Sequence, residues 1–368
     1  MRFIAPLLMA LTTCACQAPA ATIVATPETL LARVRSARPG DEVLLAAGSY
    51  PPLILRDVAK ASPGSTIRPA EGAAAILSGL RFYGVSGVSV KDCRIESTIK
   101  FAIELRQTKD IAIKGCEIRG PTVAQRGLND VWQGFYIKDS KNIDVVNNNI
   151  HDLRIAIGFG TVDDLNIEGN KIHDIASDGI RGAGTNIKIV RNTAWNLFKW
   201  NSDHIDFVQF ATVANWTGGV TPAHIMIEDN EFRRRDGHQA QGIFMRGTPE
   251  VGYADVTIRG NGFVGANLNG IAVNFIDRVL VEDNFVQAEQ GANLSTISVK
   301  ESKEVAIRGN VASAERIVSV GNTPADPVGK NSLGLRRAPP GDYSALEAWR
   351  ARRATGSRTS PRAHNSRD

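Results

Sequence analysis

A short alternation of apolar and polar residues, closed by an asparagine or a cysteine, recurs along the middle of the chain. Its template is x-h-x-h-x-x-N, in which h is an apolar residue. The alternation predicts a short strand with one buried face. The polar residue or glycine before the asparagine predicts a tight turn, because Gly and Asn tolerate left-handed backbone angles. The template occurs nine times and closes at Cys93, Cys116, Asn148, Asn170, Asn192, Asn230, Asn261, Asn284 and Asn310.

The closing residues recur at intervals of 22 to 38 positions, which suits the coils of a solenoid with insertions in the longer coils. A leucine-rich repeat has a similar period, but its Leu-x-x-Leu-x-Leu signature is absent. We expect the asparagine amides to stack in a buried column and to hydrogen-bond turn backbone that would otherwise lack partners. Cys93 and Cys116 would be small buried members of this column, not reactive or metal-binding thiols.

A second apolar strand precedes most templates. In a stack of coils these strands form one parallel sheet with open edges only at its two ends. The alternation predicts that Ile180, Ile205, Ile243 and Ile271 align and point inward, so that their neighbours point outward. The predicted fold is therefore all-β: a single-stranded right-handed parallel β-helix.

The pattern divides the chain into four parts. We assign residues 1–20 to a signal peptide, 21–80 to an N-terminal cap and the first coils, 81–322 to the β-helix repeats, and 323–368 to a basic C-terminal tail. Thr26 and Pro27 give a helix-start signal, so a capping helix should follow them. The tail is rich in Pro, Gly, Ser and Arg. We expect it to be largely disordered from about residue 339, apart from one short helix over 344–353.

Charge and the N-terminus bear on partners and location. The net charge is +5, but the tail from Lys330 carries nine basic and three acidic residues, so the body is near neutral and a nucleic-acid partner is not expected. Arg2, an apolar run and Ala18-Pro-Ala20 are typical of a bacterial export signal, and no later segment suits a transmembrane helix. We expect a secreted or periplasmic protein, with a lipoprotein anchored at Cys14 or Cys16 as the weaker alternative.

The segment Ala37-Arg-Pro-Gly-Asp-Glu-Val-Leu-Leu-Ala-Ala-Gly-Ser-Tyr50 resembles the entry of pectate-lyase-like β-helix proteins. It is particularly similar to the chondroitinase B and alginate lyase group. With the asparagine repeats, the resemblance covers roughly residues 23–320. It implies the β-helix fold but does not fix the chemistry, since this superfamily includes lyases, epimerases, hydrolases and phage tailspikes.

Insertions mark the functional edge of a solenoid, and here they cluster around the strands at 134–138, 204–208 and 242–246. Outward side chains of these strands should therefore face a groove. The polar and cationic groups there favour an acidic, uronate-containing polysaccharide as the partner. The candidate catalytic residues are His204, Asp206, Arg181 and Lys138, and the candidate substrate-binding residues are Tyr136, Arg154, Gln209, Arg246 and Asn274.

The sharpest local motif is His204 and Asp206, which would share one face of a strand, pre-oriented for acid/base chemistry. A lyase is the leading interpretation: Lys138, Arg181 or His204 would take the proton at C5, and β-elimination would follow. A C5-epimerase would use the same proton abstraction, and Asp203-His-Ile-Asp206 faintly resembles its Asp-Pro-His-Asp motif. A polygalacturonase-type hydrolase needs paired carboxylates, and the Asp-Asp pair expected in the next coil is missing. Non-catalytic glycan binding is the alternative outside enzymes.

Two further features concern histidines and metals. His151-Asp152 and His173-Asp174 lie at matching positions, which favours a stacked structural ladder over catalysis. No Cys/His cluster has metal-ligand spacing. Asp203 or Asp206 could contribute to a Ca²⁺ site with carboxylates from adjacent coils, although the sequence does not require one.

Overall fold

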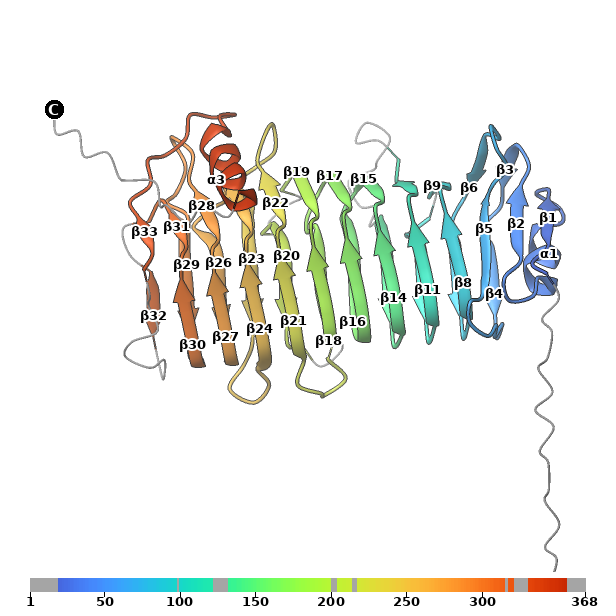
Figure 1. Cartoon of the computed structure of the whole chain (residues 1–368), viewed down its shortest axis with the longest axis horizontal. Helices are drawn as coiled ribbons and strands as arrows, with labels where there is room; N and C mark the ends of the chain where they lie inside the picture. Colours follow the sequence, from blue (N-terminus) through green and yellow to red (C-terminus); the bar gives the residue numbers. More distant parts are fainter. Residues whose placement is uncertain are drawn as a thin grey trace, which may run out of the picture.

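The computed structural model describes residues 19–97, 99–121, 132–199, 204–213, 217–314, 317–320 and 330–355. Within these ranges the chain winds as a solenoid, and its strands stack side by side along the long axis of the molecule (Figure 1). Neighbouring strands pair in parallel, each with the strand one coil away. The predicted all-β solenoid is therefore confirmed.

Strands of the first row precede the templates and carry most of the predicted site residues. Most of them show a buried residue at alternate positions, as the h-x-h pattern predicts. The strands of this row are β4 (Leu53–Arg56), β7 (Leu80–Tyr83), β10 (Phe101–Arg106), β13 (Gln133–Lys138), β16 (Ile155–Glu168), β18 (Ile180–Val190), β20 (Asp206–Ala211), β23 (Gln241–Arg246), β26 (Asn269–Asn274), β29 (Thr296–Lys300) and β32 (Val318–Val320).

The template strands form the second row. β16 and β18 continue without a break from the first row into the second, so both rows belong to one 21-stranded sheet. The remaining strands of this row are β1 (Thr22–Ala25), β2 (Glu42–Leu45), β5 (Ser65–Pro69), β8 (Ser86–Lys91), β11 (Lys109–Lys114), β14 (Lys141–Val146), β21 (Ala223–Glu228), β24 (Tyr253–Arg259), β27 (Ile276–Glu282) and β30 (Lys303–Arg308).

The third row follows the column residues and forms a separate 12-stranded sheet. Side chains from all three rows meet inside the coil in one continuous apolar core. The strands of the third row are β3 (Gly48–Tyr50), β6 (Ala75–Leu77), β9 (Arg94–Glu96), β12 (Glu117–Arg119), β15 (Asn149–Leu153), β17 (Lys171–Ile175), β19 (Thr193–Leu197), β22 (Glu231–Arg233), β25 (Gly262–Val264), β28 (Phe285–Gln287), β31 (Val311–Ala312) and β33 (Ser332–Leu333).

The asparagine column lies buried at the turn between the second and third rows. Asn170 Nδ2 donates to Asn192 Oδ1 at 2.9 Å, and the same oxygen accepts the backbone N–H of Asn170 at 2.9 Å. Asn192 Nδ2 in turn donates to Ile167 O at 2.9 Å. The residue before the asparagine adopts a left-handed angle, with φ of +55° at Arg191. The predicted column is therefore confirmed, and Asn331 extends it by one coil.

The two cysteines begin the column as predicted. Cys93 and Cys116 are free and buried, and the backbone N–H of Cys93 lies 3.4 Å from Cys116 Sγ. Cys116 connects the two cysteines to the asparagine column, because its backbone N–H donates to Asn148 Oδ1 at 2.9 Å.

The histidine ladder is also confirmed, on the third row. The rings of His151 and His173 stack with centroids 4.8 Å apart, and His173 stacks on Trp195 at 4.5 Å. Each imidazole Nδ1 pairs with the aspartate that follows it, at 2.8 Å for Asp152 and 2.6 Å for Asp174. The contacts of these histidines stabilise the stack of coils. We therefore look for the candidate site on the first row.

One part of the predicted alignment is wrong. Ile180 pairs with Val208 and not with Ile205, so the strand of this coil is shifted by three residues. The prediction missed this alignment because Phe207 takes the place of the glycine that precedes the aligned isoleucine in the neighbouring coils. A Cβ on Gly179 would lie 3.2 Å from Phe207 Cδ2, so the missing side chain leaves room for the aromatic ring. Ile205 is buried just ahead of the strand.

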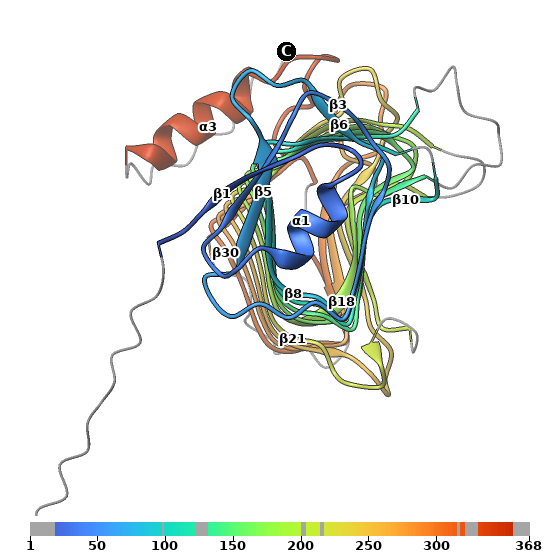
Figure 2. The same ribbon diagram turned by 90° about the vertical axis from the view of Figure 1, so that its right-hand side faces the viewer.

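A helix lies at the N-terminal end of the solenoid. The helix predicted after Pro27 is α1 (Leu30–Ser36), which buries Leu30 and Val34 and lies across the N-terminal end of the coil (Figure 2). The described helices include none long and apolar enough to cross a membrane.

The C-terminal tail differs from the prediction. The short helix expected over 344–353 is present as α3 (Ser344–Ala354), but it packs on the third row, where Leu346 and Trp349 are buried against Phe285 and Val264. Its two apolar side chains meet an exposed side of the solenoid, which the sequence of the tail alone could not indicate. Residues 356–368, and residues 1–18 of the predicted signal peptide with its cysteines, lie outside the described ranges.

Candidate functional site

Two carboxylates and an imidazole from neighbouring coils meet where β18 and β20 begin. His204 Nδ1 lies 3.0 Å from Asp206 Oδ2, which also accepts a hydrogen bond from Gln209 Nε2 at 2.8 Å. Asp178 Oδ1 accepts the backbone N–H of Asp206 at 3.1 Å, and its Oδ2 lies 3.3 Å from a guanidinium nitrogen of Arg181. We call these five residues the Asp206 cluster. Four of them were predicted from the sequence, and Asp178 was not.

Burial divides the Asp206 cluster into an inner and an outer part. Asp206 is 0% exposed and Asp178 is 2% exposed, whereas the side chain of His204 is 61% exposed. The expectation that His204 and Asp206 both face the solvent is therefore right for His204 and wrong for Asp206. An exposed imidazole is thus held by a carboxylate that water does not reach.

Burial also changes the acidity of both carboxyl groups. Burial, with the nearby charge of Asp206, raises the pKa of Asp178 to about 6, against the lowering effect of Arg181. Burial likewise raises the pKa of Asp206, against the hydrogen bonds from His204 and Gln209. Neighbouring titratable groups with perturbed pKa values are typical of sites that transfer protons, although structural networks show them too.

Asp178 could have been found from the sequence by aligning the coils on glycine. A polar residue precedes the glycine that opens several first-row strands, in the pairs Gln133-Gly134, Asp178-Gly179, Gln241-Gly242 and Asn269-Gly270. Asp206 pairs with Gln241 and therefore belongs to the same line of residues. The coil of Asp206 has Phe207 at the glycine position, which hid the correspondence.

The other predicted site residues lie on the first row but outside the Asp206 cluster. Arg246 pairs with Ala211, which lies five residues beyond Asp206 on β20. Arg246 therefore lies further along the strands than the Asp206 cluster. Lys138 Nζ lies 3.4 Å from Asp139 and donates to Thr161 at 2.7 Å. Because Lys138, like Arg181, has a carboxylate partner, the face is less cationic than the sequence suggested.

Three further candidates have structural contacts of their own. The ring of Tyr136 stacks on Phe101 with centroids 4.7 Å apart. Asn274 Oδ1 accepts the backbone N–H of Gly247 at 2.9 Å. The backbone N–H of Arg154 donates to Trp132 O at 2.8 Å, just before β16.

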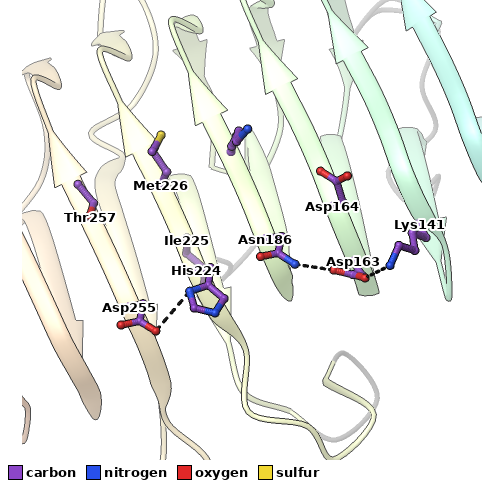
Figure 3. A pocket seen from close by; sticks show the side chains of 10 residues that line it. Lys141, Asp163, Asp164, Asn186, His224, Ile225, Met226, Asp255 and Thr257 are labelled. Carbon is purple, nitrogen blue, oxygen red and sulfur yellow. Dashed lines mark hydrogen bonds and ion pairs between the residues drawn. The ribbon is translucent and has the colours of Figure 1, made fainter.

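A separate groove crosses the second row (Figure 3). His224 lies in it with Nδ1 3.3 Å from Asp255, and Asn186 Nδ2 donates to Asp163 at 2.7 Å. The sequence analysis did not predict this groove. It is lined by Lys141, Asp163, Asp164, Asn186, Lys188, His224, Ile225, Met226, Asp255 and Thr257.

Within the described ranges, Asp178, His204 and Asp206 are the group that could hold a metal ion, since one ligand atom of each lies within 4.8 Å of the others. This donor set of two carboxylates and one imidazole is short of the six to eight oxygens that Ca²⁺ takes. Asp203, the other predicted Ca²⁺ ligand, lies outside the described residues. Calcium binding therefore stays a prediction.

Comparison with known families identifies the class of protein. The family model described as "Right handed beta helix region" matches residues 78–199, which cover the coils from β7 to β19. With the parallel register of the described strands, this defines the chain as a right-handed parallel β-helix protein. No curated protein matches the sequence.

Solved structures support the same fold. The surface adhesin PfbA of Streptococcus pneumoniae is 13% identical, with a TM-score of 0.55 over 83% of this chain and 86% of that chain. The GH136 lacto-N-biosidase of Eubacterium ramulus is 11% identical, with a TM-score of 0.54 over 86% of this chain and 68% of that chain. At this identity both likenesses show the fold alone, so function must be argued from the site.

Proposed function

We propose that this protein binds an acidic, uronate-containing polysaccharide on the first row and acts on it as a lyase. The reaction would remove the proton at C5 of a uronate and form a C4–C5 double bond. The glycosidic oxygen at C4 would leave with the other sugar as a hydroxyl group, taking its proton from water. One observation carries the proposal: the exposed imidazole of His204 is held at Nδ1 by the buried carboxylate of Asp206.

The geometry supports His204 as the base. When Nδ1 carries the hydrogen that Asp206 accepts, the other ring nitrogen, Nε2, is the basic one. Asp206 stabilises the imidazolium that forms when Nε2 takes a proton, since a buried carboxylate interacts more strongly with a neighbouring cation than an exposed one. Gln209 Nε2 also donates a hydrogen bond to this carboxylate oxygen and so helps to hold it in place. A positioned side chain of this kind contributes about 10²–10⁴-fold to a proton-transfer step.

Arg181 supports the choice of a uronate. Removing the C5 proton places negative charge on the neighbouring carboxylate group of the sugar, so a cation beside it lowers the barrier. One guanidinium nitrogen of Arg181 lies 3.3 Å from Asp178, and the side chain is 28% exposed. A guanidinium has five N–H donors in a fixed fork, so it can contact Asp178 and a substrate carboxylate together.

Hydrolysis of a glycosidic bond is the second candidate. Two carboxylates, those of Asp178 and Asp206, lie close together, although the Asp-Asp pair of the polygalacturonase pattern is missing from the sequence. However, a hydrolase must bring both groups to the glycosidic bond, and here both are buried behind His204 and Arg181. Their burial favours proton transfer through the imidazole. A C5-epimerase would use the same base, and glycan binding without catalysis remains the alternative outside enzymes.

A screen against alginate, pectate and chondroitin separates these functions by their products. A lyase forms an unsaturated uronate, which absorbs in the ultraviolet and counts in favour of the proposal. An epimerase leaves the chain intact but inverts C5, which is read by NMR, and a hydrolase releases reducing ends without the new absorbance. Binding without any product would contradict the proposed reaction and favour a glycan-binding protein.

A further inference from the structure

The outward face of the first row changes its chemistry at the Asp206 cluster. The register pairs Tyr136 with Gly158, Gly158 with Arg181, Arg181 with Gln209, and Gln209 with Phe244. These residues therefore form one line across the coils. Because adjacent strands lie about 4.8 Å apart, Arg181 and Phe244 stand about 10 Å apart, on either side of Gln209.

The N-terminal side of the cluster carries charged side chains, and one of them, Glu104, pairs with Tyr136 and so belongs to the line. Arg106 lies 2.6 Å from Glu104, and Lys138 lies 3.4 Å from Asp139. Arg181 continues this set at the cluster itself. A bound sugar on this side meets cations that a carboxylate group can share.

On the C-terminal side, the line through Arg181 and Gln209 continues with uncharged side chains. Asn269 Nδ2 donates to Gln241 Oε1, which makes a pair of amides one and two strands beyond Asp206. Phe244 and Ala272 continue the line beyond Gln209. Among the described outward residues of β20, β23 and β26, the cation is Arg246. It lies two residues beyond Phe244, at the level of Lys138 and not on the line through Arg181.

Phe244 lies directly beside the proposed base. Its ring is partly exposed, and its centroid is 6.1 Å from that of His204 with the planes at 68°. A phenyl ring offers an apolar surface on which the C–H face of a sugar ring can pack, but it offers nothing to a carboxylate. The position next to His204 is therefore better suited to an uncharged sugar than to a second uronate.

We propose that the site takes a glycan in which an acidic sugar, bound over Arg181, is linked to an uncharged sugar, packed on Phe244. This inference rests on the proposed function, since it assigns the two sugars on either side of the bond that is acted on. Phe244 is then a specificity-determining residue, and polymers made only of uronates are the poorer substrates.

Calorimetric titration of the full chain tests the preference without requiring turnover. The two probes have equal length. One is an oligogalacturonate, made only of uronates, and the other is an unsulfated chondroitin oligosaccharide, in which a uronate alternates with an uncharged N-acetyl sugar. We expect the alternating probe to bind about tenfold more tightly. Phe244→Ala should remove this preference and Phe244→Tyr should keep it. Met226→Ala, in the groove of the second row, is the control that should leave both affinities unchanged.

The outcomes separate this inference from the proposed function. Equal affinity for the two probes, or a preference that survives Phe244→Ala, overturns the inference even if a uronate polymer is cleaved. A preference that depends on Phe244, without cleavage of either polymer, supports the inference and overturns the lyase reaction.

Discussion

Two exposed imidazoles pair with aspartates on different faces of the solenoid, and only one of the two pairs has the features of a catalytic site. The side chains of His204 and His224 are 61% and 60% exposed, and their Nδ1 atoms lie 3.0 and 3.3 Å from the carboxylate. The carboxylates differ. The side chain of Asp206 is 0% exposed, whereas that of Asp255 is 33% exposed and also lies 2.5 Å from Arg278.

The environment of the carboxylate therefore distinguishes the pairs, and the histidine contact does not. Burial raises the pKa of Asp206. The hydrogen bond from Arg278 lowers the pKa of Asp255, whose charge is thus already compensated. Asp206 must rely on His204 and on neutral donors, so a positive imidazole gains more from it. A histidine–aspartate contact alone is common on surfaces, and a desolvated carboxylate behind the histidine is the more specific sign.

The largest expected effect is on turnover. His204→Ala should lower the rate on a uronate polymer by about 10²–10⁴-fold, because it removes the proposed base. His224→Ala is the matched control, and it should leave the rate unchanged because its pair lies on the other row (Figure 3). Initial rates of the two variants, with circular dichroism to check folding, provide the comparison. Equal losses of rate in both variants, or no loss in either, would contradict the proposed difference between the His204 and His224 pairs.

Asp206→Asn should have the next largest effect on the rate. We expect a loss of about 10²-fold, since the imidazole remains but loses the carboxylate that stabilises its charged form. The melting temperature should not fall, because an amide costs less to bury than a carboxylate and can still accept from Gln209. A large fall in melting temperature with an unchanged rate would assign Asp206 a purely structural role.

The acidity of Asp178 predicts a pH-dependent stability. Its pKa is raised from 3.8 to about 6 in the folded chain, so the folded chain holds this proton more tightly than the unfolded chain does. The free energy of unfolding should therefore decrease as pH rises from about 4 to about 6. Asp178→Asn should lack this decrease and become relatively more stable at neutral pH, by at most about 3 kcal/mol. Urea unfolding of both proteins across this range measures the gap, and a gap that shrinks with rising pH would contradict the assignment.

The smallest effect is expected for Asp255, the aspartate of the His224 pair. Asp255→Asn removes an exposed pair with Arg278 and His224, so the melting temperature should change little and the change should shrink at high salt. The rate on a uronate polymer should stay at the wild-type value. A loss of rate as large as that of Asp206→Asn would show that the second row takes part in the reaction.

The repeated parts of the molecule could be predicted from the sequence, because each coil repeats the same chemistry. Asn192 and its neighbours in the column show the pattern openly. The same reasoning failed at Phe207, where an aromatic replaces a glycine and the predicted alignment was wrong by three residues. It also missed Asp178, which lies 28 residues before Asp206 in sequence but one coil away in space. The packing of Trp349 depends on a surface formed by several coils, which local patterns do not encode.

The central claim is that the Asp206 cluster removes a proton from C5 of a uronate. A polymer deuterated at C5 tests this directly, by comparing its rate with that of the unlabelled polymer and by following the label in the product. We predict that deuterium is lost to water and that turnover of the labelled polymer is slower. Product that keeps its C5 deuterium and forms at the same rate would contradict the account and favour hydrolysis.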